Sequence, residues 1–247
     1  MFHTDVAPGV HRLAHADVNV YLIEDDDGIT VVDTGLPATA GRIEEAVARI
    51  GRRVDDVRGI VLTHAHFDHV GSAKRLHEQW HVPVWAHRDE KFLAAHPYRY
   101  RHERNRLLYP VRYPGSVPVL ARMTVAGALW VRGLDDVSLF HTSEALSLPG
   151  RPVPLHTPGH TYGHCALSLP DRDTVIVGDA IVTLDPYTGR RGPQIVSGAA
   201  TADSTTALAS LAAIADTGAT HVLPGHGEPW HDGAISAVEQ AVLAGPS

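Results

Sequence analysis

The sequence is poor in cysteine and in long apolar runs, and each shortage excludes a class of protein. Cys165 is the only cysteine among 247 residues, which excludes an internal disulfide framework and favours a small buried apolar role for this side chain. No run of eighteen apolar residues occurs, so we expect no membrane-spanning helix. Residues 1–20 contain no basic segment followed by an apolar one. We therefore expect no signal peptide and predict a cytoplasmic protein.

Positive charge is also in short supply. The formal net charge is −7, and only Lys74 and Lys91 are lysines, so composition gives no general case for nucleic-acid binding. The hydrophobic share of 44% and the length of 247 residues are typical of globular proteins with a sizeable core. We predict a single domain over residues 1–247, with an inserted piece in the middle.

Histidine, in contrast, is abundant, and four potential metal ligands fall within six residues. An apolar run at 60–62 predicts a buried strand, and His64, His66, Asp68 and His69 follow it. Because the backbone is still extended just after a strand, His64 and His66 point the same way and can bind one ion. Asp68 and His69 lie where the chain turns and can face a second ion. Imidazole and carboxylate together suit zinc or iron.

Three further candidate ligands lie in the second half of the chain. His160 stands in Thr-Pro-Gly-His-Thr, Asp179 ends Val-Ile-Val-Gly-Asp, and His226 stands in Leu-Pro-Gly-His-Gly. Asp179 and His226 follow apolar strands, and all three lie beside glycine or proline, where a loop can turn a side chain into a shared cleft. His156 and His164 flank His160, and either a supporting contact at the site or packing at a strand end would explain them.

The two halves of the chain repeat one plan of strands and helices. An acidic turn with glycine at 25–28 predicts a hairpin. The first half predicts strands at 10–13, 18–23, 29–32, 59–62 and 82–86, and helices at 40–50 and 70–80. The second half predicts strands at 164–169, 174–177 and 221–223, and helices at 202–215 and 236–243. This pattern favours two sheets packed face to face and covered outside by helices.

Residues 88–133 break this pattern. The stretch carries nine Arg or Lys residues against three acids, with four tyrosines among them, and an apolar segment at 117–131 ends it. We predict a helical insertion at about 88–140 that packs against the body of the protein or against a second subunit as a homodimer. A lid whose arginines meet an anionic substrate is the alternative. Nucleic acid is the least favoured partner.

The complete set of candidate ligands resembles that of the metallo-β-lactamase superfamily. The order is HxHxDH, then His, then Asp, then His, and the resemblance includes the Val-Val-Asp-Thr-Gly segment that ends at residue 35. It implies an α/β fold, an αββα sandwich of two mixed sheets flanked by helices, with two metal ions at one edge. It further implies that His64, His66 and His160 bind one ion, that Asp68, His69 and His226 bind the other, and that Asp179 bridges them. Asp33 resembles the family's acid behind a ligand imidazole, and His164 is a second candidate for such a supporting contact.

The resemblance implies a hydrolase with two zinc ions per chain, with iron or manganese as alternative metals. A hydroxide shared by the ions would attack an ester, thioester, lactone or amide of a small molecule, and Asp68 would orient it and shuttle its proton. The alternatives are a mononuclear iron oxidoreductase of the persulfide dioxygenase type and a phosphodiesterase or nuclease of the same superfamily. A protein that binds without turnover is disfavoured because every ligand is present.

Candidate substrate residues lie after Asp179. Quorum-quenching lactonases place a tyrosine three residues after the bridging aspartate, where this chain has Val182. Tyr187 is the candidate to replace it. Arg190 and Arg191 follow in the same loop, where they could meet a carboxylate or phosphate of the substrate.

Overall fold

The first half of the chain builds a seven-stranded sheet whose strands follow sequence order. The structure is a computed structural model that describes residues 1–247. Four strands form an antiparallel meander, and three further strands add in parallel: β1 (Phe2–Ala7), β2 (Val10–His15), β3 (Val18–Asp25), β4 (Gly28–Val32), β5 (Val57–Val61), β6 (Val84–His87) and β7 (Ser138–Phe140). The predicted hairpin joins β3 to β4, with Asp25 paired to Gly28. Glycine is required there because φ is +135° and a Cβ would lie 2.3 Å from a backbone oxygen.

The second half builds a smaller mixed sheet and a separate hairpin. The four-stranded sheet has the order β13-β10-β9-β8, with β13 parallel to β10 and the other pairs antiparallel. Its strands are β8 (Val153–His156), β9 (Cys165–Leu169), β10 (Thr174–Gly178) and β13 (His221–Pro224). β11 (Val182–Leu184) and β12 (Arg191–Gln194) form the two-stranded hairpin.

Successive side chains of a strand point alternately into two apolar layers, one between the sheets and one under the helices. In β3, Tyr21 and Ile23 belong to an apolar cluster that also contains Leu167 and Ile176 of the other sheet, whereas Leu22 packs on the opposite face. Side chains in a strand point alternately to its two faces, so these strands are buried on both sides and read as continuous apolar runs. Cys165 is fully buried in the layer between the sheets, as an apolar role requires.

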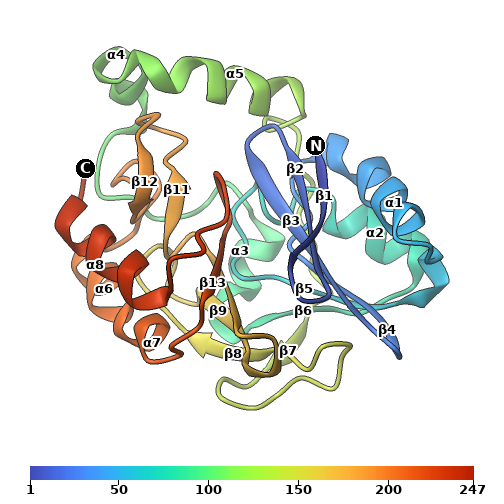
Figure 1. The fold of residues 1–247 in the computed structure, drawn as a ribbon. Coiled ribbons are helices and arrows are strands. Elements are labelled where there is room, and N and C mark those ends of the chain that lie inside the picture. Colours follow the sequence, from blue (N-terminus) through green and yellow to red (C-terminus); the bar gives the residue numbers. More distant parts are fainter.

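Helices cover the two outer faces (Figure 1). α1 (Ala40–Arg49) and α2 (Ala73–Trp80) pack on the first sheet, and α6 (Ser204–Ser210), α7 (Ala212–Ala215) and α8 (Ala234–Ala244) pack on the second. The layers therefore run helix, sheet, sheet, helix, which confirms the predicted fold class. Three single 3₁₀ turns complete this part of the structure: η1 (Pro37–Thr39), η2 (Val54–Asp56) and η6 (Pro170–Arg172).

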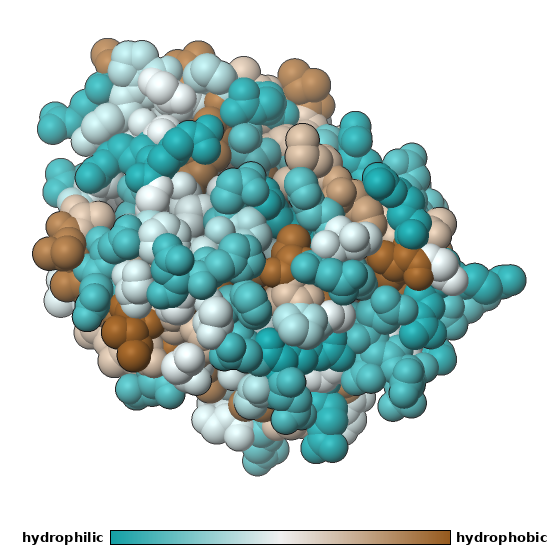
Figure 2. Space-filling view, viewed as in Figure 1, coloured by the Kyte–Doolittle hydropathy of each residue, from teal (hydrophilic) through white to brown (hydrophobic).

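The Arg/Tyr-rich stretch contains only helical elements and crosses one end of the sandwich, as the green segment in Figure 1 shows. It comprises η3 (Arg88–Glu90), α3 (Lys91–Ala95), η4 (Arg106–Leu108), α4 (Tyr109–Arg112), η5 (Pro114–Ser116) and α5 (Val117–Val125). Val119 and Met123 of α5 are buried against the body, whereas Val117 and Val125 are exposed. Figure 2 shows that hydrophobic residues on the viewed face form small separate groups. The single-domain assignment and the homodimer stay predictions.

Several predicted element boundaries were wrong, for identifiable reasons. The helix predicted from 70 begins at Ala73, because residues 67–72 form separate turns that carry Asp68 and His69. The helix predicted over 202–215 is divided at Leu211 into α6 and α7. β1, β7, β8, β11 and β12 were not predicted, because they are short or lack a clear apolar alternation. No helix has both the length and the apolar composition needed to cross a bilayer.

Candidate metal centre

The seven predicted ligands come from four loops that meet at one edge of the sandwich. His64, His66, Asp68 and His69 follow β5, which is a parallel strand of the first sheet. In the second half, His160 lies between β8 and β9, Asp179 directly follows β10, and His226 follows β13. The carboxyl ends of β5, β10 and β13 thus supply six of the seven side chains, and loops at such ends are where open α/β sheets bind ligands.

Two separate groups of three side chains have the spacing of a metal site, and a third, formed by His64, His69 and Asp179, shares one member with each of them. The candidate ligand atoms of His64, His66 and His160 lie within 4.8 Å of one another, and so do those of Asp68, His69 and His226. The ring centroids within the first group are 4.5 to 4.8 Å apart. All six side chains are at most 6% exposed. Each group could hold one ion.

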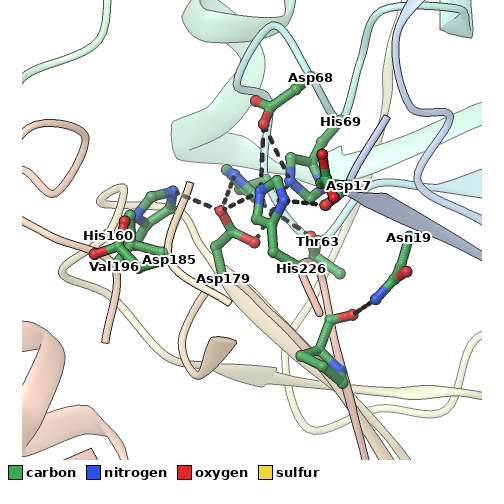
Figure 3. Close-up of polar contacts among 12 residues, drawn as sticks. Asp17, Asn19, Thr63, Asp68, His69, His160, Asp179, Asp185, Val196 and His226 are labelled. Carbon is green, nitrogen blue, oxygen red and sulfur yellow. Dashed lines mark hydrogen bonds and ion pairs between the residues drawn. The ribbon is translucent and has the colours of Figure 1, made fainter. Parts of the chain in front are cut away.

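Asp179 lies between the two groups (Figure 3). Its Oδ2 is 3.4 Å from Nε2 of His160 and 3.3 Å from Nε2 of His226. Its Oδ1 is 3.5 Å from Nε2 of His69. This carboxylate therefore faces both groups.

Several nitrogen and oxygen atoms that face this centre form no hydrogen bond. Nε2 of His64, His66, His69 and His160 and Oδ1 of Asp179 are buried without a hydrogen bond. Leaving one buried polar atom unpaired costs about 1–3 kcal/mol, and here five converge on one place. Imidazole and carboxylate lone pairs that accept no hydrogen bond and converge in a buried site are what a divalent cation requires.

The opposite ring nitrogens of four histidines do have partners; Nδ1 of His64, for example, lies 3.1 Å from Oγ1 of Thr63. Nδ1 of His69 lies 2.9 Å from Oδ2 of Asp33, and Nδ1 of His226 lies 2.7 Å from the carbonyl oxygen of Asp17 (Figure 3). Nδ1 of His160 lies 3.3 Å from Oγ1 of Thr201. A donor role for each Nδ1 places the free lone pair on Nε2, directed at the centre.

Burial and the carboxylates divide the histidines into two kinds. Burial holds the pKa of His66 at about 4 and that of His160 well below its usual value. Burial also acts to lower the pKa of His69, but Asp179, Asp33 and Asp68 raise it to about 9. The group of His64, His66 and His160 therefore consists of neutral imidazoles, whereas carboxylates surround His69 in the other group.

Asp33 and His164, the two candidates for a supporting contact, lie behind the centre. Oδ1 of Asp33 accepts from the N–H of Thr63, and its Oδ2 accepts from the hydroxyl of Thr63 and faces His69. Asp33 adopts φ +58°, a left-handed conformation that aspartate tolerates better than most residues. Nε2 of His164 accepts from the N–H of Asp179 at 3.1 Å, so it positions that residue's backbone.

Of the three candidate substrate residues, one lies near the centre and two lie elsewhere. The hydroxyl of Tyr187 is 3.3 Å from that of Tyr100, whose ring lies 4.2 Å from the ring of His66. Tyr187 therefore belongs to the surroundings of the centre. Arg190 instead lines a cavity of about 540 Å³ to which none of the seven candidate ligands contributes. Arg191 is exposed on β12.

A smaller cavity opens directly on the centre. It has a volume of about 200 Å³, and its lining includes His160, the aromatic residues Tyr100 and Tyr162, and the arginines Arg99 and Arg101. Arg101 also lies 6.0 Å from the ring centroid of Tyr162. Part of the Arg/Tyr-rich stretch thus borders the centre, which the lid alternative required.

Three residues that support the centre were not predicted from the sequence. Tyr100 is one of several tyrosines among arginines, and nothing else distinguishes it. Asn19 donates from Nδ2 to the carbonyl oxygens of Pro224 and Gly227, on either side of His226. Glu90 is fully buried and accepts hydrogen bonds from two ligand loops. No local motif marks any of them, because each acts on residues far away in the sequence.

Comparison with known proteins agrees with this geometry. The family model described as the metallo-beta-lactamase superfamily matches residues 15–226. A relative named "Probable metallo-hydrolase YflN", from Bacillus subtilis (strain 168), is 32% identical over 246 residues, which cover 91% of this chain and 86% of YflN.

Solved structures show the same likeness. The metallo-beta-lactamase family protein TTHA1429 from Thermus thermophilus superposes with a TM-score of 0.67 at 26% identity, over 94% of this chain and 78% of that one. TTHA1623, solved in a di-iron-bound form, superposes with a TM-score of 0.61 at 27% identity, over 89% of this chain and 92% of that one.

Proposed function

The chain belongs to the metallo-β-lactamase superfamily of metal-dependent hydrolases, and from this premise we propose that it is a dinuclear zinc hydrolase of a small molecule. The bond attacked would be an ester, thioester, lactone or amide. One observation carries the proposal: a buried cluster of imidazole nitrogens and carboxylate oxygens that have no other partner. His64, His66 and His160 would hold one ion, Asp68, His69 and His226 the other, and Asp179 would lie between them.

Bound divalent ions supply a hydroxide nucleophile near neutral pH and Lewis-acid stabilisation of the carbonyl oxygen. The residues of the chain do the rest. Asp68, whose Oδ2 lies 3.3 Å from Nε2 of His226, would orient the attacking water and take its proton. Asp33 would hold His69 in one tautomer through the bond at Nδ1. Tyr100 would shield His66 from bulk water with its ring.

A small anionic substrate is the proposed partner. The cavity of about 200 Å³ beside His160 is too small for a macromolecule. Asp89 and the buried Glu90 also line it, and Arg99 and Arg101 are the groups there that could bind an anionic substrate. The substrate panel should therefore pair each neutral ester, thioester, lactone and amide with a carboxylate-bearing analogue. We expect a lower KM for the anionic member of a pair.

The proposal is tested by metal content together with two substitutions. Protein purified without added metal should contain close to two zinc ions per chain by plasma mass spectrometry. His66→Ala and Asp68→Ala should fold and lose at least about a hundredfold in kcat/KM, because each removes a metal ligand or the proton acceptor. His231→Ala is the matched control, since it removes an imidazole from a pair with His221 outside the cluster.

Two outcomes would contradict the proposal. Full turnover in either cluster variant would remove the assigned roles. About one iron per chain would redirect the search to oxygen chemistry and to persulfide substrates. Two irons per chain would retain the dinuclear hydrolase and change only the metal, a result that the likeness to the di-iron form of TTHA1623 makes worth distinguishing.

A further inference from the structure

Glu90 is a buried carboxylate without a cationic partner, and the proposed chemistry does not use it. It ends η3, just after β6, and its side chain is 0% exposed. Burial raises its pKa, and no Arg, Lys or His lies within ion-pair distance of it. Burying such a group costs free energy unless its oxygens are well bonded, so its hydrogen bonds should explain its presence.

Both oxygens of Glu90 accept backbone hydrogen bonds, and each bond comes from a different ligand loop. Oε2 accepts from the N–H of Ala65 at 2.8 Å, and Ala65 is the residue between His64 and His66. Oε1 accepts from the N–H of Gly163 at 3.0 Å, three residues after His160. One carboxylate therefore connects the loop of the first sheet to the loop of the second.

The fit around Glu90 is close on the Gly163 side. A Cβ placed on Gly163 would lie 2.8 Å from Oε1 and 2.9 Å from Cγ of Glu90. Gly163 is not in the left-handed region of φ, so its backbone would accept alanine and only space forbids it. The glycine is thus explained by the approach of this carboxylate.

We propose that Glu90 is a positioning residue that holds the loop of His64 and His66 and the loop of His160 at the separation one metal ion needs. These three histidines form one of the two groups. Asp68 and His69 lie further along the same loop as Ala65, but Glu90 accepts no hydrogen bond from their own N–H groups or from the loop of His226. Loss of Glu90 should therefore affect one metal site and spare the other. This inference rests on the metal binding that the proposed function assumes.

The test is a zinc titration of the full chain, read as two binding steps against a chromophoric chelator. Glu90→Gln keeps the shape but replaces one acceptor oxygen with an N–H donor, which then faces a backbone N–H. We expect one step to weaken by about 10–100-fold and the other to stay within about threefold. Gly163→Ala should give the same pattern from the opposite side, and it decides the question if Glu90→Gln does not fold.

A matched control separates positioning from general destabilisation. Asp185 is also a fully buried carboxylate that accepts two backbone N–H groups, from Tyr187 at 2.8 Å and from Ser197 at 3.0 Å. Neither donor belongs to one of the four ligand loops: Tyr187 lies between β11 and β12, and Ser197 follows β12. Asp185→Asn should cost comparable stability and leave both zinc affinities unchanged.

Amide exchange supplies a readout that needs no metal. In metal-free Glu90→Gln, the amides of Ala65 and Gly163 should exchange faster than in the wild type, because their acceptor is weakened. Unchanged zinc affinities in both Glu90→Gln and Gly163→Ala would overturn the proposal, as would equal weakening of both steps. Wild-type protein that binds two ions but hydrolyses nothing would reject only the proposed function. Wild-type protein that binds no metal would reject both.

Discussion

At the scale of single residues, the sequence predicted the candidate ligands but only some of the groups that orient them: the family resemblance indicated Asp33, proximity to a candidate ligand indicated His164, and nothing indicated Glu90 or Asn19. His64, His66, Asp68 and His69 could be found because four ligand types within six residues form a signal by themselves. Glu90 and Asn19 carry no such signal. Their partners lie between 25 and 208 positions away, so their roles appear only when the chain is folded.

Asp33 offers the clearest test of an orienting residue. Its two oxygens serve three donors: the N–H and hydroxyl of Thr63 and Nδ1 of His69. Asp33→Asn keeps a side chain that tolerates φ +58° but leaves one of these donors facing an N–H group. We expect zinc affinity at the His69 site to fall by about 10–100-fold, measured by chelator competition.

The control for Asp33→Asn is another aspartate in the left-handed region. Asp173 has φ +48° and accepts a hydrogen bond from the N–H of Thr220 at 2.9 Å, away from the candidate ligands. Asp173→Asn should leave both zinc affinities at their wild-type values. Wild-type affinity in Asp33→Asn would show that His69 needs no carboxylate behind it.

At the scale of elements, the sequence predicted buried strands well and short strands poorly. β3, β4 and β10 are buried on both faces over most of their length, and β5 is buried except at Arg58, so each shows a mainly apolar run. β8 and β12 contain Pro154 and Pro193 and have only four residues each, and such strands give no periodicity to detect. The division between α6 and α7 was also hidden, because alanine and leucine continue through it.

Hydrogen bonds join β3 to the loop after β13, although the two are distant in the sequence. Asn19 of β3 donates from Nδ2 to the carbonyl oxygens of Pro224 and Gly227, each at 2.8 Å, and accepts from Nε of Arg12 at 2.9 Å. Asn19→Ala would leave the carbonyl of Gly227 and Nε of Arg12 without a partner, whereas the carbonyl of Pro224 still accepts from the hydroxyl of Tyr21 at 2.7 Å. We expect the free energy of unfolding to fall by about 1–3 kcal/mol, measured by urea denaturation of the metal-free protein.

Asn105→Ala is the control for this contact. Asn105 is exposed and accepts only a local hydrogen bond, from the N–H of Leu107 at 3.0 Å. Its loss should change the urea midpoint little. A midpoint for Asn19→Ala equal to that of the wild type would mean that water replaces the lost amide and that the side chain of Asn19 is not needed to hold the His226 loop, to which β3 is also joined by the N–H of Asn19 and the hydroxyl of Tyr21.

At the scale of the whole molecule, the candidate centre exists only where the two halves of the chain meet. The first half supplies four of the seven side chains and the second half three. The repeated strand plan and the resemblance to one superfamily predicted this arrangement. The position of the Arg/Tyr-rich stretch could not be predicted, because helices with many exposed arginines could lie against several surfaces, and only the fold places Arg99 and Arg101 beside His160.

The gathering of so many ionisable groups makes the stability of the metal-free protein depend on pH in two directions. Burial lowers the pKa of His66 to about 4 and that of His164 to about 3, whereas an unfolded histidine has about 6.5. Below about pH 6.5 the unfolded chain therefore binds more protons than the folded one, and stability falls as the pH is lowered. Burial also opposes charge on His69, but Asp179, Asp33 and Asp68 raise its pKa to about 9. Between about 6.5 and about 9 the folded state holds the extra proton, so stability falls as the pH rises.

We therefore expect the Tm of chelator-treated protein, measured from pH 4.5 to 9.5, to peak near about pH 6.5. The acid side should be the steeper one, because the pKa values of His64 and His160 are lowered along with those of His66 and His164, whereas only His69 and His226 are raised. His69→Gln should flatten the alkaline side, since it removes a group that loses its proton there. Zinc competes with these protons for the same nitrogens, so two equivalents should raise Tm more at pH 8 than at pH 5. A metal-free Tm that rises steadily from pH 6.5 to 9 would show that the carboxylates do not hold a proton on His69.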